Sequence, residues 1–165
     1  SKSQPDFSKL QIELKSLPLN ELNFPKETTY VTFVPEHNHC LGLSFENSTV
    51  YHKLKTVLWV PYSASKTLAF PKRKIATPIL WQPNLDQYQA LKNDFEEIME
   101  FISLKGLDKI TARLGCYLHV RPKAANSLVK QNVLNQEGNW VKTGPRGFYL
   151  RTSFTQQILK SHGFV

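Results

Sequence analysis

Two carboxylates and a lysine near the start of the chain have the residue types of a metal-dependent catalytic site. Asp6 precedes Glu13, and Lys15 follows two residues later. Residues two apart on a strand point to the same face, so Glu13 and Lys15 would project together while Leu14 faces the core. Paired carboxylates bind Mg²⁺ through oxygen, and a lysine beside them can assist a water and stabilise charge on a phosphate. This D-x(n)-E-x-K pattern is typical of metal-dependent nucleases, although a solvated strand face would carry the same residues.

Two later motifs combine basic residues with aromatic or small ones. The run RPKAAN (121–126) follows a predicted strand, and its Arg, Lys and Asn are side chains that read guanine and adenine edges. The turn PRGFY (145–149) presents Arg146 beside two aromatic residues. His52 and Lys53 precede a predicted buried strand and could supply a phosphate contact. The alternatives are an ordinary basic turn at 121–126, aromatic residues of the core at 145–149 and a surface pair at 52–53.

The positive charge of the chain is concentrated in its last third. The 165 residues carry 21 Lys and Arg against 13 Asp and Glu, for a net charge of +8. Residues 1–104 hold 11 basic and 11 acidic side chains, whereas residues 105–165 hold 10 basic and 2 acidic ones. A basic segment beside a neutral scaffold suits binding to a phosphate backbone, but a solubilising surface has the same totals.

Composition and motifs exclude several other classes. A hydrophobic content of 41% with 12% aromatics excludes a disordered or fibrous protein. We expect no membrane segment and no signal peptide, and two cysteines predict a reducing cytosol rather than a disulfide framework. Phosphate-binding loops, nucleophile elbows and zinc-protease motifs are missing from the sequence. His37, His39 and Cys40 have ligand chemistry but lack a fourth partner, so a polar loop is the alternative to a metal site.

Hydrophobic periodicity predicts one domain of class α/β, in which helices flank a mixed β-sheet. A long helix begins at the N-cap Asn84 and ends at Gly106, with Asp94 on its polar face. Cys116 is expected in the core. Predicted strands cover 10–17 (ended by Pro18), 28–34, 57–62, 75–81 (moved to a sheet edge or interrupted by Pro78) and 116–121, with a hairpin of 140–142 and 148–151; further helices cover 47–55, 107–114 and 153–160.

Three longer motifs resemble the MutH family of DNA mismatch repair endonucleases. They are YHKLKTVLWVP (51–61), ITARLGCYLHVRPKAANS (110–127) and GPRGFYLRTSFT (144–155), and the stretch 6–29 follows the family in order and spacing. The resemblance covers essentially the whole chain. It implies a restriction-endonuclease-like mixed β-sheet flanked by α-helices, related to type II restriction enzymes.

The resemblance also implies an activity. Such enzymes use Mg²⁺, for which Mn²⁺ could substitute, to nick the unmethylated strand 5′ of the G in hemimethylated GATC. Their partners are double-stranded DNA, the activator MutL and, indirectly, MutS. We therefore expect a bacterial cytoplasmic protein that associates with the nucleoid when acting, and one nick per site suggests a monomer without a membrane role.

Residue roles carry over by position. Asp6, Glu13, Lys15 and Lys53 match the catalytic group, and Asp6, Glu13 and the backbone carbonyl of Leu14 match the metal ligands. The predicted DNA contacts are Arg121, Pro122 and Lys123 in the loop that reads GATC, Tyr149 as the sensor of adenine methylation, and Arg146 and Tyr30 nearby.

Two departures from the family pattern bear on function. The family has an N-terminal helical arm with a further acid, whereas only five residues precede Asp6 here, so we expect residues 1–165 to be a single nuclease domain without that arm. The alternatives are a non-catalytic GATC-binding fragment and a relative of GATC-cleaving type II restriction enzymes. His119 stands where relatives tend to carry Gln.

Overall fold

The computed structural model describes residues 4–35, 43–65, 69–123, 130–134 and 137–164, and it has an α/β fold, as the sequence predicts. In chain order the elements are β1 (Glu13–Leu19), β2 (Thr29–Phe33), the 3₁₀ helix η2 (Phe45–Asn47), α1 (Thr49–Leu54), β3 (Val57–Ser63), the 3₁₀ helix η3 (Phe70–Lys72), β4 (Ile79–Trp81), α2 (Leu85–Lys105), β5 (Leu118–Pro122), β6 (Gln131–Leu134), β7 (Trp140–Thr143), β8 (Arg146–Leu150) and α3 (Thr152–Ser161).

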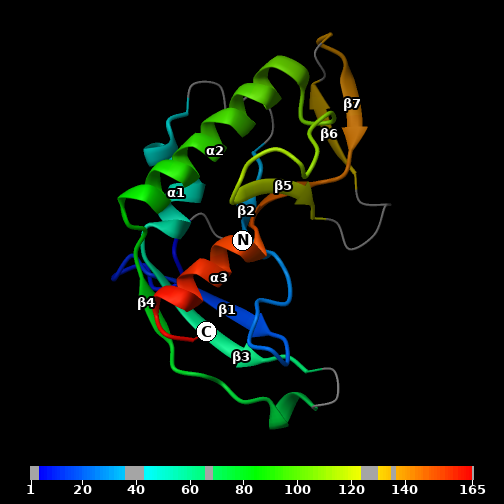
Figure 1. Cartoon of the computed structure of the whole chain (residues 1–165). Coiled ribbons are helices and arrows are strands. Elements are labelled where there is room, and N and C mark those ends of the chain that lie inside the picture. Colours follow the sequence, from blue (N-terminus) through cyan, green and yellow to red (C-terminus); the bar gives the residue numbers. More distant parts are fainter. Residues whose placement is uncertain (1–3, 36–42, 66–68, 124–129, 135–136, 165) are drawn as a thin grey trace.

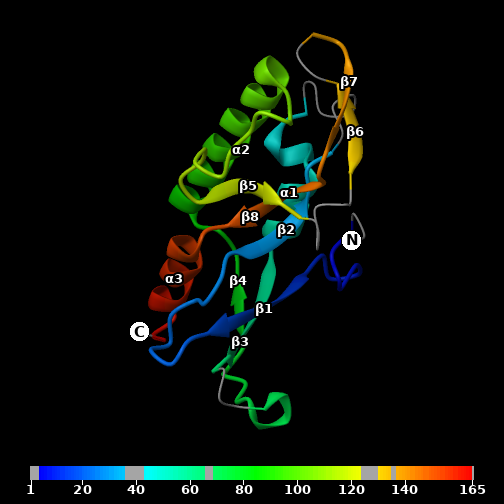
Figure 2. The ribbon, with the colours of Figure 1, turned by 90° about the vertical axis from the view of Figure 1, so that its right-hand side faces the viewer.

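Two three-stranded sheets lie one above the other (Figures 1 and 2). The first has the order β1–β3–β4, with β1 parallel to β3 and β4 antiparallel to it. The second has the order β2–β8–β5 and is antiparallel throughout. Strands β6 and β7 form a separate antiparallel hairpin at the end of the molecule farthest from η3 (Figure 1). Strands β1 and β2, which are neighbours in sequence, therefore belong to different sheets.

The long helix α2 begins and ends where the sequence predicts. Asn84 accepts a hydrogen bond from the Gln87 backbone N–H, and the Gln87 side chain accepts one from the Asn84 N–H, which forms a capping box. Gly106 ends the helix with φ of 91°, a conformation that favours glycine. The apolar positions of the helix are buried against the core: Leu91, Phe95, Ile98 and Ile102.

Asp94 lies on the buried side of α2, which corrects its placement on the polar face. Its carboxylate accepts hydrogen bonds from the backbone N–H groups of Cys116 (2.7 Å), Tyr117 (2.7 Å) and Leu118 (2.8 Å). A buried charge is stable only when it is hydrogen-bonded, and three backbone donors meet that need here. Asp94 therefore anchors the start of β5 to α2.

The expected helix at 107–114 is wrong, because this segment forms turns. Two arginines from the last third of the chain bind backbone carbonyls of this segment. Arg146 donates to the carbonyls of Asp108 and Ile110, and Arg151 donates to those of residues 112–115. The segment is thus held by tertiary contacts rather than by its own hydrogen bonds. Cys116, expected in the core, is exposed.

The strand predictions are wrong mainly in which strands pair with each other and in where each strand begins and ends. The hairpin expected from 140–142 and 148–151 does not form, because β7 pairs with β6 and β8 pairs with β2 and β5. Strand β1 starts at Glu13 and runs through Pro18 to Leu19. Its position at the sheet edge tolerates the missing N–H of a proline. The predicted interruption at Pro78 is confirmed, since β4 begins at Ile79.

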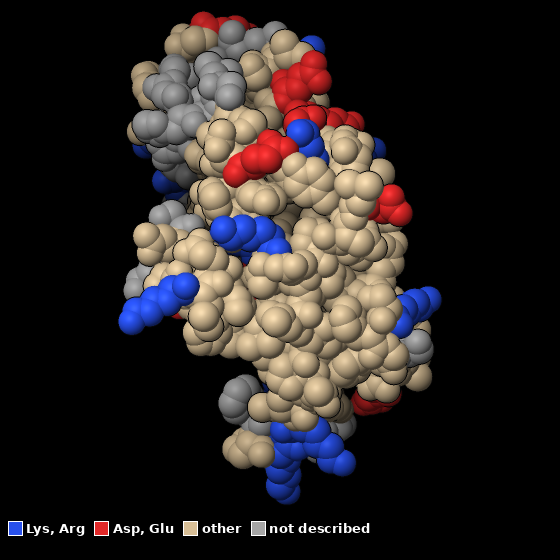
Figure 3. Space-filling model, turned by 90° about the vertical axis from the view of Figure 1, so that its left-hand side faces the viewer, with Lys and Arg blue, Asp and Glu red and all other residues tan. Residues whose placement is uncertain are grey.

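The face opposite the one seen in Figure 2 carries scattered charges of both signs, and most of it is uncharged (Figure 3). Its lower end carries a group of basic side chains (Figure 3). None of the helices in the described ranges is both long and apolar enough to cross a membrane.

Candidate active site

Strand β1 turns two charged residues inward. Glu13 and Lys15 project to the same side, as expected, but that side is the buried one, and Leu14 is exposed. The expectation that Leu14 faces the core is therefore wrong. Burying these charges is tolerated because each finds a partner, as a buried ion must.

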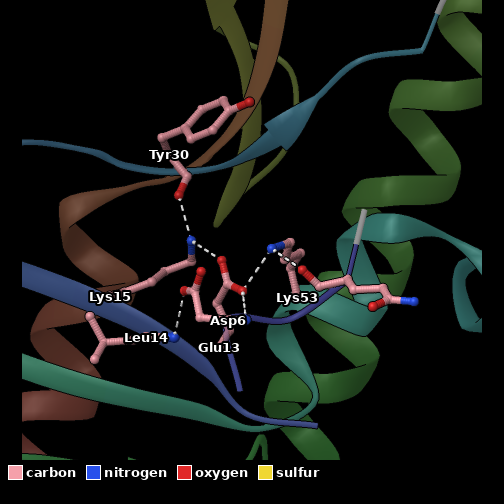
Figure 4. A network of polar contacts seen from close by, with 7 residues as sticks. Asp6, Glu13, Leu14, Lys15, Tyr30 and Lys53 are labelled. Carbon is pink, nitrogen blue, oxygen red and sulfur yellow. Dashed lines mark hydrogen bonds and ion pairs between the residues drawn. The ribbon is translucent and has the colours of Figure 1, made fainter. Parts of the chain in front are cut away.

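The Glu13 carboxylate is the centre of this polar network (Figure 4). Its Oε2 accepts a hydrogen bond of 2.7 Å from Lys53 Nζ, which comes from α1, and its Oε1 accepts one of 3.3 Å from Lys15 Nζ. All three side chains are less than one-tenth exposed. Lys53 also donates to the carbonyl of Gln4, at 2.8 Å, which ties the N-terminal segment to α1. The network thus joins β1 and the N-terminal segment to α1, whose Lys53 is 40 positions from Glu13 in the sequence.

Asp6 lies at the exposed edge of the network. Its Oδ2 accepts a hydrogen bond of 3.1 Å from the Leu14 N–H, and its own N–H lies 3.3 Å from Glu13 Oε2. These contacts bring the Asp6 and Glu13 carboxylates to the same end of β1 (Figure 4).

The donor set at this place fits a magnesium ion better than a zinc ion. In the part of the chain that the structure describes, no group of three or more His, Cys, Asp or Glu side chains could hold a metal. Mg²⁺ commonly uses one or two carboxylates and completes its shell with waters and substrate phosphates. Asp6 and Glu13 could provide those carboxylates. The expectation that the Leu14 carbonyl is a ligand stays a prediction, since the contact seen from Leu14 to Asp6 uses its N–H.

Lys15 is held between a carboxylate and a carbonyl. Besides its contact with Glu13, Lys15 Nζ donates a hydrogen bond of 2.9 Å to the backbone carbonyl of Tyr30 in β2. Burial lowers the pKa of the Lys15 amine below its ordinary value, and the charge of Glu13 partly opposes that shift. An amine with a lowered pKa releases its proton more readily, which suits a group that assists a water nucleophile.

A cleft of about 620 Å³ runs from this network to the second sheet. One wall comes from β1 and Tyr62 of β3, and the other comes from the segment 27–30, the end of β5 and Tyr149 of β8. Its lining residues include Leu14, Lys15, Tyr30, Arg121, Pro122, Lys123 and Tyr149. The structure thus brings five of the six predicted DNA contacts into one cleft with the candidate catalytic lysine.

The basic and aromatic residues of the cleft contact one another. Lys123 Nζ lies 3.5 Å from the centre of the Tyr30 ring, and the Arg121 guanidinium lies 5.8 Å from the centre of the Tyr149 ring. The two tyrosine rings meet edge to face, 5.4 Å apart. Burial raises the pKa of the Tyr149 phenol, and the charge of Arg121 opposes the shift.

One sequence-derived candidate lies outside the cleft, and four others are not among the described residues. Arg146 is not part of the cleft lining, because its guanidinium binds the carbonyls of the 108–110 turn, so its DNA contact stays a prediction. His37, His39 and Cys40 lie outside the described residues, as does Asn126 at the end of the sequence run 121–126.

Sequence reasoning missed two residues that shape this cleft. Thr28 accepts a hydrogen bond of 2.7 Å from Arg121 Nη1, and its position just before a β-branched strand was the available signal. Gly147 leaves space for the Tyr30 ring, since a Cβ at this position would come within 2.8 Å of Tyr30 Cε2. No sequence pattern indicated that second contact.

Comparison with known proteins identifies the family. The family model described as DNA mismatch repair enzyme MutH matches residues 1–94. The chain is 47% identical over 162 residues to the DNA mismatch repair protein MutH of Vibrio campbellii, and this match covers 98% of the chain and 71% of the relative. It is 48% identical over 159 residues to the Shewanella putrefaciens protein of the same name, with 96% and 71% covered. The chain belongs to the MutH family of DNA mismatch repair endonucleases.

Proposed function

We propose that this protein nicks the unmethylated strand of double-stranded DNA, 5′ of the G in hemimethylated GATC, in a reaction that depends on Mg²⁺. The observation that carries the proposal is the cleft that places Lys15 together with Arg121, Lys123 and Tyr149. Within one cleft, a substrate could meet both a hydrolytic group and side chains that recognise bases.

The hydrolytic half of the site is built from β1 and α1. Asp6 and Glu13 would hold Mg²⁺, which when bound would stabilise negative charge developing on the scissile phosphate. Lys15 would orient the attacking water and accept its proton, because burial favours the neutral amine. Lys53 would keep the Glu13 carboxylate in place through their 2.7 Å contact.

The recognition half of the site comes from the second sheet. Arg121 and Lys123 lie on and just after β5, where their long side chains could reach guanine O6 and N7 in the major groove. Pro122, the last residue of β5, would set the direction of the chain between them. Tyr149 lines the same cleft, where its phenol could contact the adenine whose methylation distinguishes the two strands. Tyr30 and Arg146 would support these contacts from neighbouring strands.

The family supplies the remaining parts of the proposal. MutL would activate the enzyme, and MutS would act indirectly by reporting the mismatch. Mn²⁺ would substitute for Mg²⁺. A monomer in the bacterial cytoplasm, associated with the nucleoid when acting, would suffice to make one nick at each site.

A plasmid with a single GATC site tests the proposal directly. We expect nicked circles from the hemimethylated plasmid with Mg²⁺, more of them with MutL, and few from the fully methylated plasmid. Primer extension on the product should map the break to the 5′ side of G on the unmethylated strand. Cleavage of both strands regardless of methylation would favour a restriction enzyme relative. Binding to GATC without any break would favour a non-catalytic fragment.

A further inference from the structure

The hairpin of β6 and β7 packs one of its faces on the core and leaves the other exposed. Val133 is buried, and Val141, which lies opposite it in the hairpin, packs against the same core cluster. Because side chains alternate along a strand, positions 132, 140 and 142 point to the opposite side. The exposed residues there, with the one directly before β6, are Lys130, Asn132, Trp140 and Lys142, which we call the outer face of the hairpin.

Trp140 sets this face apart from the rest of the molecule. It is 66% exposed, whereas Trp59 and Trp81, the other two tryptophans of the chain, are buried. An indole ring in water presents a large apolar surface that can pack on another flat or apolar group. Covering this ring with a bound partner would therefore be favourable.

The neighbours of Trp140 indicate the kind of partner. Lys142 follows it two residues along β7 and lies directly opposite Asn132 of β6. Lysine is depleted in the centres of protein interfaces, whereas lysine and asparagine side chains commonly bind phosphate oxygens. Glu137, the single acidic residue of the segment 130–143, lies in the turn and not on the two strands. The outer face thus complements a polyanion better than it complements a protein surface.

The hairpin is inserted between two strands of the candidate DNA cleft. Strand β5, which precedes it, carries Arg121, and strand β8, which follows it, carries Tyr149. The N–H of Lys123 donates a hydrogen bond of 2.8 Å to the carbonyl of Pro145, which closes the base of the insertion. From this base the hairpin extends toward the end of the molecule opposite η3 (Figures 1 and 2). The outer face is therefore continuous with the recognition half of the site.

The length of the hairpin gives it a reach beyond a site of four base pairs. Trp140 lies five residues before Pro145, and a strand rises about 3.3 Å per residue, so the two positions are about 17 Å apart. Successive base pairs are about 3.4 Å apart, so this reach corresponds to about five of them. A duplex that lies along the hairpin would meet Trp140 in the sequence that flanks the site.

We propose that the outer face of the hairpin binds the backbone of the duplex DNA that flanks the recognition site. A two-stranded β-ribbon has a width that fits the major groove. Lys130 and Lys142 bind phosphates, and the ring of Trp140 packs against a deoxyribose at the edge of the groove. Such contacts carry no sequence information, so the hairpin adds affinity without adding preference for GATC. The inference rests on the proposed function for its ligand, duplex DNA with the site in the cleft.

The test compares a short duplex, with about three base pairs on each side of GATC, with a long duplex that has about fifteen. A second long duplex has one base pair of GATC changed. Binding is measured in EDTA by fluorescence anisotropy at several salt concentrations. The variants are Trp140→Ser and the double variant Lys130→Gln with Lys142→Gln. Lys160→Gln, at an exposed position in the last turn of α3, is the matched control.

The variants should lose affinity for the long duplex alone. We expect Trp140→Ser to weaken that binding by about tenfold, the scale of burying one large apolar side chain. The double lysine variant should reduce the slope of log K against log salt concentration by about two. Both should bind the short duplex like the wild type and keep its preference for GATC over the changed site. Lys160→Gln should match the wild type throughout.

Tryptophan fluorescence adds a measurement that a merely structural role of Trp140 would not change. Because Trp59 and Trp81 are buried, acrylamide quenches mainly the fluorescence of Trp140. The long duplex should protect this fluorescence from acrylamide, and the short duplex should not. The variant Trp140→Ser should show little quenching and no protection.

Equal losses of affinity for both duplexes in Trp140→Ser would overturn the inference and leave the proposed function standing. A Trp140 that stays open to acrylamide in the complex with the long duplex would do the same. Protection that rises with protein concentration in the absence of DNA would overturn it in favour of contact between two copies of the chain. Protection by the long duplex without any nicking would support the inference and refute the proposed function, and failure to bind either duplex would overturn both.

Discussion

Lys53 Nζ lies 2.7 Å from Glu13 Oε2, and this ion pair joins residues that are 40 positions apart in the chain. The lysine is 4% exposed and the glutamate 7% exposed. Taking two charges out of water costs several kcal/mol, so the pair adds little net stability on its own. Its value is positional, because it fixes the carboxylate that faces Asp6 and Lys15 in the candidate active site.

Removing Lys53 should destabilise the protein strongly. In Lys53→Met the buried Glu13 keeps Lys15 but loses its shortest contact, and breaking a buried pair costs about 3–5 kcal/mol. Urea unfolding measures the loss. Lys55→Met is the matched control, because Lys55 makes a 3.3 Å contact with Gln11 at the surface, and it should change stability by less than about 0.5 kcal/mol. Equal effects of the two variants would contradict the role of the buried pair.

Asp94 should be needed to hold the start of β5 against α2. In Asp94→Asn one carboxylate oxygen is replaced by an NH₂ group. This NH₂ group faces a backbone N–H, and it cannot accept a hydrogen bond from it. We expect a loss of about 3 kcal/mol and faster hydrogen exchange at the amides of residues 116–118. Glu97→Gln, on the exposed side of α2, should leave both the stability and the exchange unchanged. Unchanged exchange in Asp94→Asn would show that other contacts hold β5.

His119 should make stability depend on pH. Burial lowers its pKa below the usual 6.5, against the opposing hydrogen bond of 3.2 Å between Nδ1 and the Ala112 carbonyl. Nearby Arg151 and Arg121 also lower the pKa, whereas Asp94 raises it. Because the unfolded chain binds the proton more readily, the stabilising contribution is complete above pH 6.5 and is lost as the pH falls below it.

The variant His119→Gln should flatten this dependence. We expect the Tm of the wild type to fall more steeply than that of His119→Gln between pH 7.5 and 5.5, a window about the ordinary histidine pKa. Thermal unfolding followed by circular dichroism gives both curves. Parallel curves for the two proteins would mean that His119 binds its proton equally well when folded.

Tyr149 should control discrimination by methylation. We expect Tyr149→Ser to narrow the gap in nicking rate between hemimethylated and fully methylated GATC by about tenfold, in line with the loss of one base contact. Tyr149→Phe keeps the ring that contacts Tyr30 and Arg121, so it separates the part played by the hydroxyl from that of the ring. A gap that stays the same in both variants would place the tyrosine in a packing role.

Local signals predicted the elements that carry their own caps and periodicity. Helix α2 combines apolar spacing with Asn84 and Gly106 at its ends, so its limits could be read from the sequence. The segment 107–114 has helical composition too, but Arg146 and Arg151 take its carbonyls, and no local pattern reveals two arginines from the last third of the chain. Strand pairing is hidden for the same reason, since it depends on distant partners.

The candidate site was predictable in its residue types and less so in its geometry. The alternation of Glu13 and Lys15 placed both on one face, but it could not show that this face is buried, because burial depends on Lys53 and the Tyr30 carbonyl. The same limit explains why the placement of Asp94 was wrong. A charged side chain favours a solvated position, and the three backbone donors that make its burial possible come from a distant segment. Thr28 and Gly147 contact Arg121 and Tyr30 in other strands, and these pairings cannot be read from the sequence around either residue.

The most direct test of the proposed chemistry compares two Asp→Asn variants on one substrate. Asp6→Asn keeps an oxygen for the Leu14 N–H but removes the charge proposed to bind the metal. Asp86→Asn makes the same chemical change at an exposed position of α2, away from the site. The measurement is the nicking rate of hemimethylated GATC duplex with Mg²⁺, beside the affinity for that duplex in EDTA. We predict that Asp6→Asn abolishes nicking while affinity persists, and that Asp86→Asn matches the wild type. Nicking by Asp6→Asn at the wild-type rate would contradict the proposed active site.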